Sequence, residues 1–133
     1  MRFSKQFLVG ILTFAALSLT GPVLAAQGKG DGEKLKQVSP QTVCMINKKH
    51  FDKAQTPITV EGRTYYACCD MCKTQLKEDP KSRMDKDPLS GKDVDKATAA
   101  IGVDKEGNVY FFENLDNLKK FRVTAKTEKN ATL

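Results

Sequence analysis

Three of the four cysteines in this chain lie within five consecutive positions, and this clustering limits what the chain can fold into. They are Cys68, Cys69 and Cys72, whereas Cys44 is separated from them by 23 residues. Any pairing into two disulfides places one bond inside the cluster, and a bond between adjacent cysteines is strained. The spacing therefore favours one shared thiol site over two long-range bridges.

The first 26 residues have the pattern of a secretory signal peptide. Arg2 and Lys5 give a basic start, an apolar run covers residues 7–19, and small residues follow at Ala25 and Ala26. An apolar core of 13 residues is too short to span a bilayer comfortably. We expect the leader to be cleaved, leaving no membrane span and a periplasmic or secreted protein.

The 107 residues that follow the leader are too few for a large enzyme scaffold. A domain of this size is marginally stable on its apolar core alone, so a metal or a disulfide would matter to it. The leader carries two basic and no acidic residues, so the net charge falls from +6 to +4. Basic residues are interspersed with acidic ones and form no block, so we expect no nucleic-acid surface.

Composition divides the chain into a leader, a tether, two folded units and a tail. The tether is expected to be flexible because residues 27–37 hold three glycines and almost no apolar side chains. The expected segments are the signal peptide (1–26), the N-terminal tether (27–41), the first unit (42–84), the second unit (85–125) and the flexible tail (126–133).

Each unit carries the pattern of a β-hairpin followed by a helix. In the first unit the hairpin is expected over residues 58–67 and the helix over 69–78. In the second unit the hairpin is expected over 101–111, and a helix with Asn114 as its N-cap follows. The two patterns match collinearly, with an offset of 43 residues before the turn and 45 after it. We therefore expect an α+β fold made of a duplicated ββα unit.

The cysteines of the first unit lie where its hairpin is expected to meet its helix. Cys68 and Cys72 would be i,i+4 neighbours and Cys69 and Cys72 i,i+3 neighbours, so their sulfur atoms can converge, with Cys44 completing the site. A helix N-terminus favours the thiolates that bind metal. Soft sulfur ligands select thiophilic ions over Ca²⁺ or Mg²⁺. The predicted ligands of one ion, Cu(I) first and Zn(II) second, are Cys44, Cys68, Cys69 and Cys72.

A family resemblance adds to this interpretation. Cys44, a hairpin-length spacer and Cys68-x-x-x-Cys72 after Tyr65-Tyr66 resemble the TRASH domain, a module of heavy-metal trafficking, resistance and sensing. The resemblance implies a small treble-clef-like fold whose metal ligands are Cys44, Cys68 and Cys72. Cys69 is an additional thiol that the pattern does not need.

The second unit resembles the related YHS domain. The similarity lies in residues 87–94 (DPLSGKDV) and 107–112 (GNVYFF), followed by a helix ending in Phe121. Ser90 stands where that pattern often carries a cysteine. The second unit is therefore expected to support the fold and to bind no metal.

The expected function is metal trafficking, sequestration or resistance in partnership with a metal donor or acceptor protein, and not catalysis. Three alternatives remain open. An even number of cysteines in an exported chain ordinarily forms disulfides. Cys69-x-x-Cys72 has the spacing of a thiol–disulfide oxidoreductase or redox sensor. A structural adaptor for a membrane complex is the third alternative.

Other residues near the cysteines are expected to have structural roles or to lie in solvent. Met45 and Met71 are expected to pack in the core, with soft auxiliary ligation as the alternative. His50, the single histidine, is expected in an exposed loop. A solvated connector is expected to carry Asp85, Asp87, Asp93 and Asp95.

Overall fold

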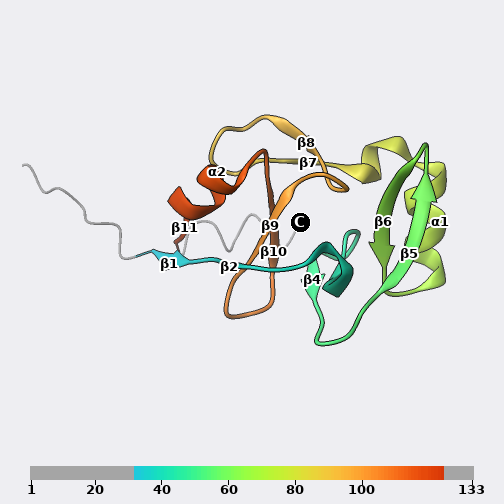
Figure 1. Cartoon of the computed structure of the whole chain (residues 1–133), viewed down its shortest axis with the longest axis horizontal. Coiled ribbons are helices and arrows are strands. Elements are labelled where there is room, and N and C mark those ends of the chain that lie inside the picture. Colours follow the sequence, from blue (N-terminus) through green and yellow to red (C-terminus); the bar gives the residue numbers. More distant parts are fainter. Residues whose placement is uncertain (1–31, 125–133) are drawn as a thin grey trace, which may run out of the picture.

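The computed structural model describes residues 32–124, which form short antiparallel strands and two helices (Figure 1). This mixture is of the α+β class that the sequence predicts. The helices are α1 (Asp70–Glu78) and α2 (Leu115–Lys120), with 3-10 turns at η1 (Pro40–Thr42) and η2 (Pro80–Arg83). The strands are β1 (Glu33–Lys34), β2 (Lys36–Gln37), β3 (Val43–Cys44), β4 (Lys49–His50), β5 (Thr56–Val60), β6 (Arg63–Ala67), β7 (Met84–Lys86), β8 (Asp93–Asp95), β9 (Ala100–Val103), β10 (Val109–Phe112) and β11 (Arg122–Val123).

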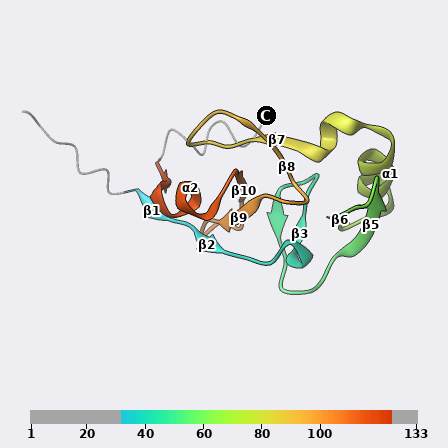
Figure 2. The same ribbon diagram turned by 45° about the horizontal axis from the view of Figure 1, so that its top comes forward.

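Two hairpins, each followed by a helix, lie towards opposite ends of an elongated molecule. The β5–β6 hairpin and α1 occupy one end, and β9, β10 and α2 lie towards the other (Figures 1 and 2). The β3–β4 pair lies between them, and the β7–β8 pair runs along one side (Figures 1 and 2). The cysteine-bearing elements are therefore held at one end and in the middle of the molecule.

The first hairpin and its helix are confirmed almost residue by residue. Strands β5 and β6 pair antiparallel around Glu61 and Gly62, which both have positive φ, as a tight two-residue hairpin turn requires. Helix α1 begins after its N-cap, Cys69, and ends at Glu78. Pro80 explains this end, because a proline forces the residue before it out of the helical region.

The second hairpin and helix also lie where the sequence predicts them. Strands β9 and β10 pair antiparallel, and the Asn114 side chain caps α2 by accepting from the backbone N–H of Asn117 at 2.9 Å. The helix ends at Lys120, one residue earlier than expected. Phe121 is still buried, and its ring lies 5.4 Å from that of Phe112.

Strand β10 is buried on both faces, and each face belongs to a different core. Phe111 points into a core that also holds Cys44 of β3 and Cys72 of α1. Tyr110 and Phe112 point the other way and pack with residues of α2 and β11. Side chains alternate across a strand, so one strand joins the cysteine site to the second helix.

The prediction of a flexible tether over residues 27–41 is wrong for residues 32–41, the part that the structure describes. Strand β1 pairs with β11, and β2 pairs with β9 as the third strand of a sheet. These pairings use backbone N–H and C=O groups, which any polar sequence offers, so composition did not reveal them. The predicted signal peptide (1–26) and tail (126–133) lie outside the described residues.

A buried lysine reinforces the contact between the two halves. The Lys96 side chain donates to the carbonyl oxygen of Met45 at 2.9 Å and to that of Ser82 at 2.8 Å. Its ammonium also lies 5.5 Å from the centroid of the Phe111 ring. Burial lowers the pKa of Lys96. The residue after Cys44 is thus tied to the second half by a buried cation.

The prediction that Asp87 lies in a solvated connector is wrong, because its side chain is fully buried. Its carboxylate accepts from the backbone N–H groups of Leu89 (2.7 Å), Ser90 (3.1 Å) and Glu113 (2.9 Å), and from Asn117 Nδ2 (2.7 Å). Burial opposes ionisation, but these hydrogen bonds outweigh it and lower the pKa of Asp87. A buried carboxylate is stable here because its donors replace water.

Asp87→Asn should destabilise the protein by about 2–3 kcal/mol at pH 7, because an amide cannot accept all four hydrogen bonds. The lowered pKa gives a stabilisation that is complete above the unfolded pKa of about 3.9 and is lost as pH falls through the folded pKa. Urea denaturation from pH 7 to pH 3 measures both effects. Asp93→Asn is the control, since that side chain is exposed; equal losses in the two variants would contradict the assignment.

Candidate metal centre

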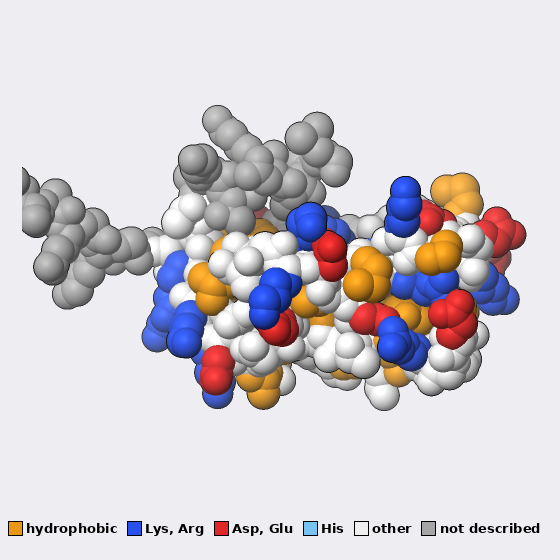
Figure 3. Space-filling model, turned by 90° about the horizontal axis from the view of Figure 1, so that it is seen from above, with side chains coloured by type: hydrophobic (Ala, Val, Ile, Leu, Met, Phe, Trp, Pro, Cys, Tyr) orange, Lys and Arg blue, Asp and Glu red, His pale blue; other side chains and the backbone are white. Residues whose placement is uncertain are grey.

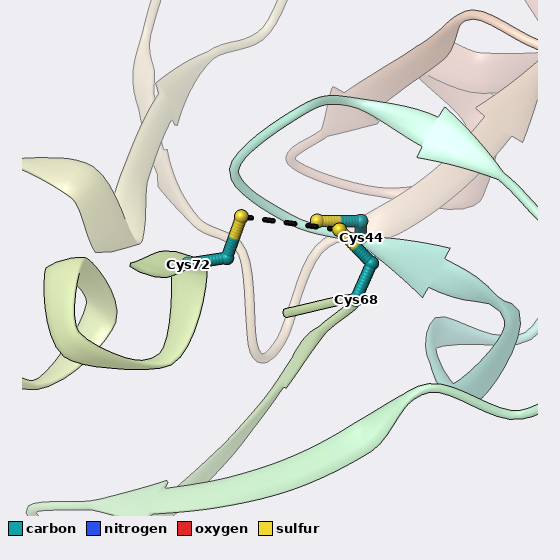
Figure 4. Close-up of side chains that lie close together, drawn as sticks. All are labelled: Cys44, Cys68 and Cys72. Atoms are coloured by element: carbon teal, nitrogen blue, oxygen red, sulfur yellow. Dashed lines mark hydrogen bonds between the residues drawn. The ribbon is translucent and has the colours of Figure 1, made fainter. Parts of the chain in front are cut away.

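Three sulfur atoms from separate parts of the first half meet at one point. The Sγ atoms of Cys44, Cys68 and Cys72 all lie within 4.8 Å of one another. Cys44 comes from the end of β3, Cys68 follows β6, and Cys72 lies in the first turn of α1 (Figure 4). Figure 4 shows the three side chains directed towards one another. The sulfur atoms of Cys68 and Cys72 are 3.9 Å apart.

A tight turn between β3 and β4 presents the Cys44 sulfur atom. Lys48 adopts a positive φ of 50°, which lets the chain reverse within four residues. The turn directs the backbone N–H groups of Ile46 and Asn47 onto the Cys44 sulfur, and the N–H of Cys68 joins them. These three backbone groups favour ionisation of the Cys44 thiol. A hydrogen bond of 3.0 Å from Met45 N to Tyr66 O ties the turn to β6.

The thiols of this cluster differ in acidity for identifiable reasons. Burial acts to raise the pKa of Cys44, but hydrogen bonds from Asn47, Cys68 and Ile46 outweigh it, and the pKa is lowered. Burial raises the pKa of Cys68 and of Cys72, and the neighbouring Cys44 raises both further. Within this cluster Cys44 is therefore the thiol that ionises most readily, and Cys68 and Cys72 lose their protons less readily.

Cys69 stands beside the cluster and outside the mutually close set of three. As the N-cap of α1 it has an exposed side chain, and its sulfur lies 3.2 Å from that of Cys72. Hydrogen bonds from the backbone and side chain of Cys72 lower the pKa of Cys69. Of the four predicted ligands, the fold brings three together and leaves the fourth at the solvent side.

Sequence analysis missed Asn47, which contacts the same cluster. Its Nδ2 donates to the Cys68 sulfur at 3.3 Å, and its Oδ1 lies 3.9 Å from the Cys72 sulfur as a hydrogen-bond acceptor. Its position three residues after Cys44 was the available indication, because metal-binding turns commonly carry ligands at C-x-x-C spacing. An asparagine in that position carries no recognisable ligand chemistry, so the spacing alone drew no attention.

The second half builds a similar turn around a carboxylate. Asp87 follows β7 as Cys44 ends β3, and each acceptor receives backbone N–H groups from the residues two and three positions ahead. Each also receives one N–H from the residue that precedes the N-cap of the next helix. The residues in corresponding places are Cys44 with Asp87, Lys48 with Gly91, Cys68 with Glu113 and Cys72 with Asn117.

The two methionines near the cysteines have different environments. Met45 is fully buried in the core, as predicted, whereas Met71 is 82 % exposed, so its predicted packing role is wrong. Met71 lies in the first turn of α1 at a position that faces solvent, one residue before Cys72. An apolar side chain in a helix is not obliged to be buried, and a nine-residue helix covers only part of its surface.

Comparisons with known proteins and the other described residues add no further indication of function. No family model, curated protein or solved structure matches this chain. Among residues 32–124, neither helix has the length and apolar character needed to cross a membrane. Acidic and basic side chains are interspersed on the face shown in Figure 3. The cysteine cluster therefore carries the functional conclusion.

Alkylation should distinguish the four thiols by charge and exposure. With limiting iodoacetamide near pH 7.5, Cys69 should react first, since it is exposed and its pKa is lowered. Cys72 should react at least about tenfold more slowly, because it is buried and its thiolate fraction falls tenfold per unit of raised pKa. Peptide mass spectrometry gives the order. The urea-unfolded protein is the control, and labelling of Cys72 before Cys69 in the native state would contradict the assignment.

Proposed function

We propose that this protein binds one thiophilic metal ion, Cu(I) in preference to Zn(II), and acts in heavy-metal trafficking, sequestration or resistance. The observation that carries the proposal is the convergence of the Cys44, Cys68 and Cys72 sulfur atoms from three separate elements. Packing alone has no need to bring three thiols within 4.8 Å of one another. Thiolates at this separation can hold one soft cation between them.

The electrostatics of the cluster support a cation as its missing partner. Backbone donors lower the pKa of Cys44, whereas the pKa values of Cys68 and Cys72 are raised, so these two thiols keep their protons near neutral pH. A bound cation would replace those two protons and offset the repulsion between the thiolates that result. Metal uptake by this site should therefore release protons.

The exposed side of the cluster suits exchange of the ion with another protein. Cys44 and Cys72 are buried, whereas Cys68 and Cys69 are exposed. An incoming thiolate can reach the exposed ligands first, so an ion can pass by stepwise replacement of ligands. We propose a metal donor or acceptor protein as the partner and Cys69 as the exchange ligand.

The family and location of the protein are also proposals. The pattern of Cys44, Cys68 and Cys72 supports membership of the TRASH and YHS group, with a treble-clef-like ββα unit that has been duplicated. The matched turns at Cys44 and Asp87 support the duplication. The leader pattern in residues 1–26 supports export to a periplasmic or extracellular space.

A thiol–disulfide oxidoreductase is the second candidate, and one observation favours it. The Cys69 and Cys72 sulfur atoms are 3.2 Å apart, and Cys69 is exposed with a lowered pKa. In this reaction the Cys69 thiolate would attack a substrate disulfide and release one substrate thiol. Cys72 would then attack Cys69, releasing the second thiol and leaving a Cys69–Cys72 disulfide for an external dithiol to reduce.

Cysteine variants separate the two functions. Under the metal hypothesis, Cys44→Ser should abolish binding of one Cu(I), because it removes one of the three converging sulfur atoms, and Cys69→Ser should retain it. Native mass spectrometry of the reduced protein, titrated with Cu(I) and with Zn(II), gives the stoichiometry. A free Cu(I) concentration of 100 times the dissociation constant should also raise the free energy of unfolding by about 2.7 kcal/mol.

The oxidoreductase hypothesis predicts the opposite pattern. Cys69→Ser should then abolish reduction of a model disulfide, and Cys44→Ser should leave it largely intact. Absence of metal uptake by the fully reduced wild-type protein would overturn the metal hypothesis.

A further inference from the structure

We propose that Asn47 sets the coordination number of the site and thereby its choice of ion. Its amide closes the side of the cluster where a fourth ligand would stand, so the site takes a three-coordinate monovalent soft cation, Cu(I) or Ag(I), over Zn(II). This inference rests on the proposed function, since it concerns the same three sulfur atoms. It adds the class of ion and the residue that selects it.

Asn47 makes contact with all three sulfur atoms of the cluster. Its backbone N–H donates to Cys44, its Nδ2 donates to Cys68 at 3.3 Å, and its Oδ1 faces Cys72 at 3.9 Å. The side chain is exposed on its other side, so the amide stands between the sulfur atoms and solvent. One residue thus orients the ligands and occupies the remaining approach to them.

The chemistry of an amide explains why the fourth position stays empty. The nitrogen lone pair of an amide is delocalised into the carbonyl group, so Nδ2 is a donor and cannot be a metal ligand. The amide oxygen, Oδ1, is a hard ligand and binds soft monovalent cations poorly. With its N–H on the Cys68 sulfur, the side chain stabilises a thiolate and adds no ligand. Structural Zn²⁺ sites are almost always tetrahedral, whereas three thiolates suit trigonal Cu(I).

Position 47 is the place from which a fourth ligand would come. It follows Cys44 at C-x-x-C spacing in a turn whose N–H groups already surround the first sulfur. Cys69 does not fill that place, because its sulfur lies beside Cys72 and outside the set in which all sulfur atoms are mutually within 4.8 Å. The residue at position 47 therefore determines whether the site has a fourth ligand.

Three thiolates around a monovalent cation carry a net charge of −2, which the surroundings must offset. The Asn47 amide, the backbone donors on Cys44 and the Lys96 ammonium, which interacts electrostatically with Cys44, all act in this sense. Outer partners of this kind typically change metal affinity by 10- to 100-fold when they are removed. The environment is thus built for a more anionic complex than Zn(II) with the same ligands would give.

Two substitutions at this position test the inference in the full protein. Asn47→Cys should create a four-sulfur site, raising Zn(II) affinity by on the order of 100-fold and shifting the Zn(II)/Cu(I) preference accordingly. Asn47→Leu, of similar size, should weaken Cu(I) binding by about tenfold or more without creating a Zn(II) site. Asn108→Leu, in the β9–β10 loop, controls for loss of a turn asparagine. Competition with chromophoric chelators gives the affinities.

Counting sulfur ligands separates ion selection from a merely structural role. X-ray absorption should find three sulfur atoms around Cu(I) in the wild type, and the Co(II) spectrum of Asn47→Cys should show a tetrahedral four-thiolate centre. If the wild type binds neither Cu(I) nor Zn(II), the proposed function fails. If the wild type binds Cu(I) but Asn47→Cys keeps three sulfur ligands and an unchanged Zn(II)/Cu(I) ratio, only the role of Asn47 is overturned.

Discussion

The burial of β10 on both faces is the constraint on which the rest of the structure depends. Phe111 packs into the core that holds Cys44 and Cys72, while Tyr110 and Phe112 pack against the second helix. A strand with two buried faces cannot shift register by one residue without exchanging its two sets of contacts. The second half therefore acts as a rigid support for the cysteine turn, and Lys96 adds a direct link to the residue after Cys44.

The two halves contain similar backbone turns, but the acceptor is a thiol in the first (Cys44) and a carboxylate in the second (Asp87). In both, N–H groups converge on an acceptor from the same relative positions, because the turn and the start of the next helix leave these donors without partners. Asp87 satisfies its donors permanently, since its carboxylate is already ionised and its fourth partner is the Asn117 amide. Where Asn117 supplies that amide, the first half has Cys72, which brings a second sulfur atom close to that of Cys44. The second turn is thus completed by an amide, whereas the first has a thiol in the corresponding place.

Local features were predictable from the sequence, and those that depend on the tertiary fold were not. Glu61-Gly62 and Asp79-Pro80 fix a hairpin and a helix end by backbone sterics, so those boundaries agree with the structure. The strands at 33–37 were missed because they form through backbone pairing with β9 and β11. Asp87 and Asn47 were missed because their roles depend on donors and sulfur atoms that come from distant elements. The cysteines were identified because a cluster of thiols indicates a metal site from residue type and spacing alone.

Two cysteines of the site are buried and two are exposed, so the site has a fixed inner side and a solvent side. Cys44 and Cys72 are fixed in the core, so their sulfur atoms cannot follow an ion outward. Cys68 and Cys69 lie at the surface, where their side chains can move without disturbing packing. Under the proposed function, an ion held by all three ligands would lose the Cys68 contact first, and the Asn47 amide that donates to that sulfur would control this step. Retention and release would then be set by one hydrogen bond at the solvent edge, with the buried sulfur atoms of Cys44 and Cys72 as the fixed part of the site.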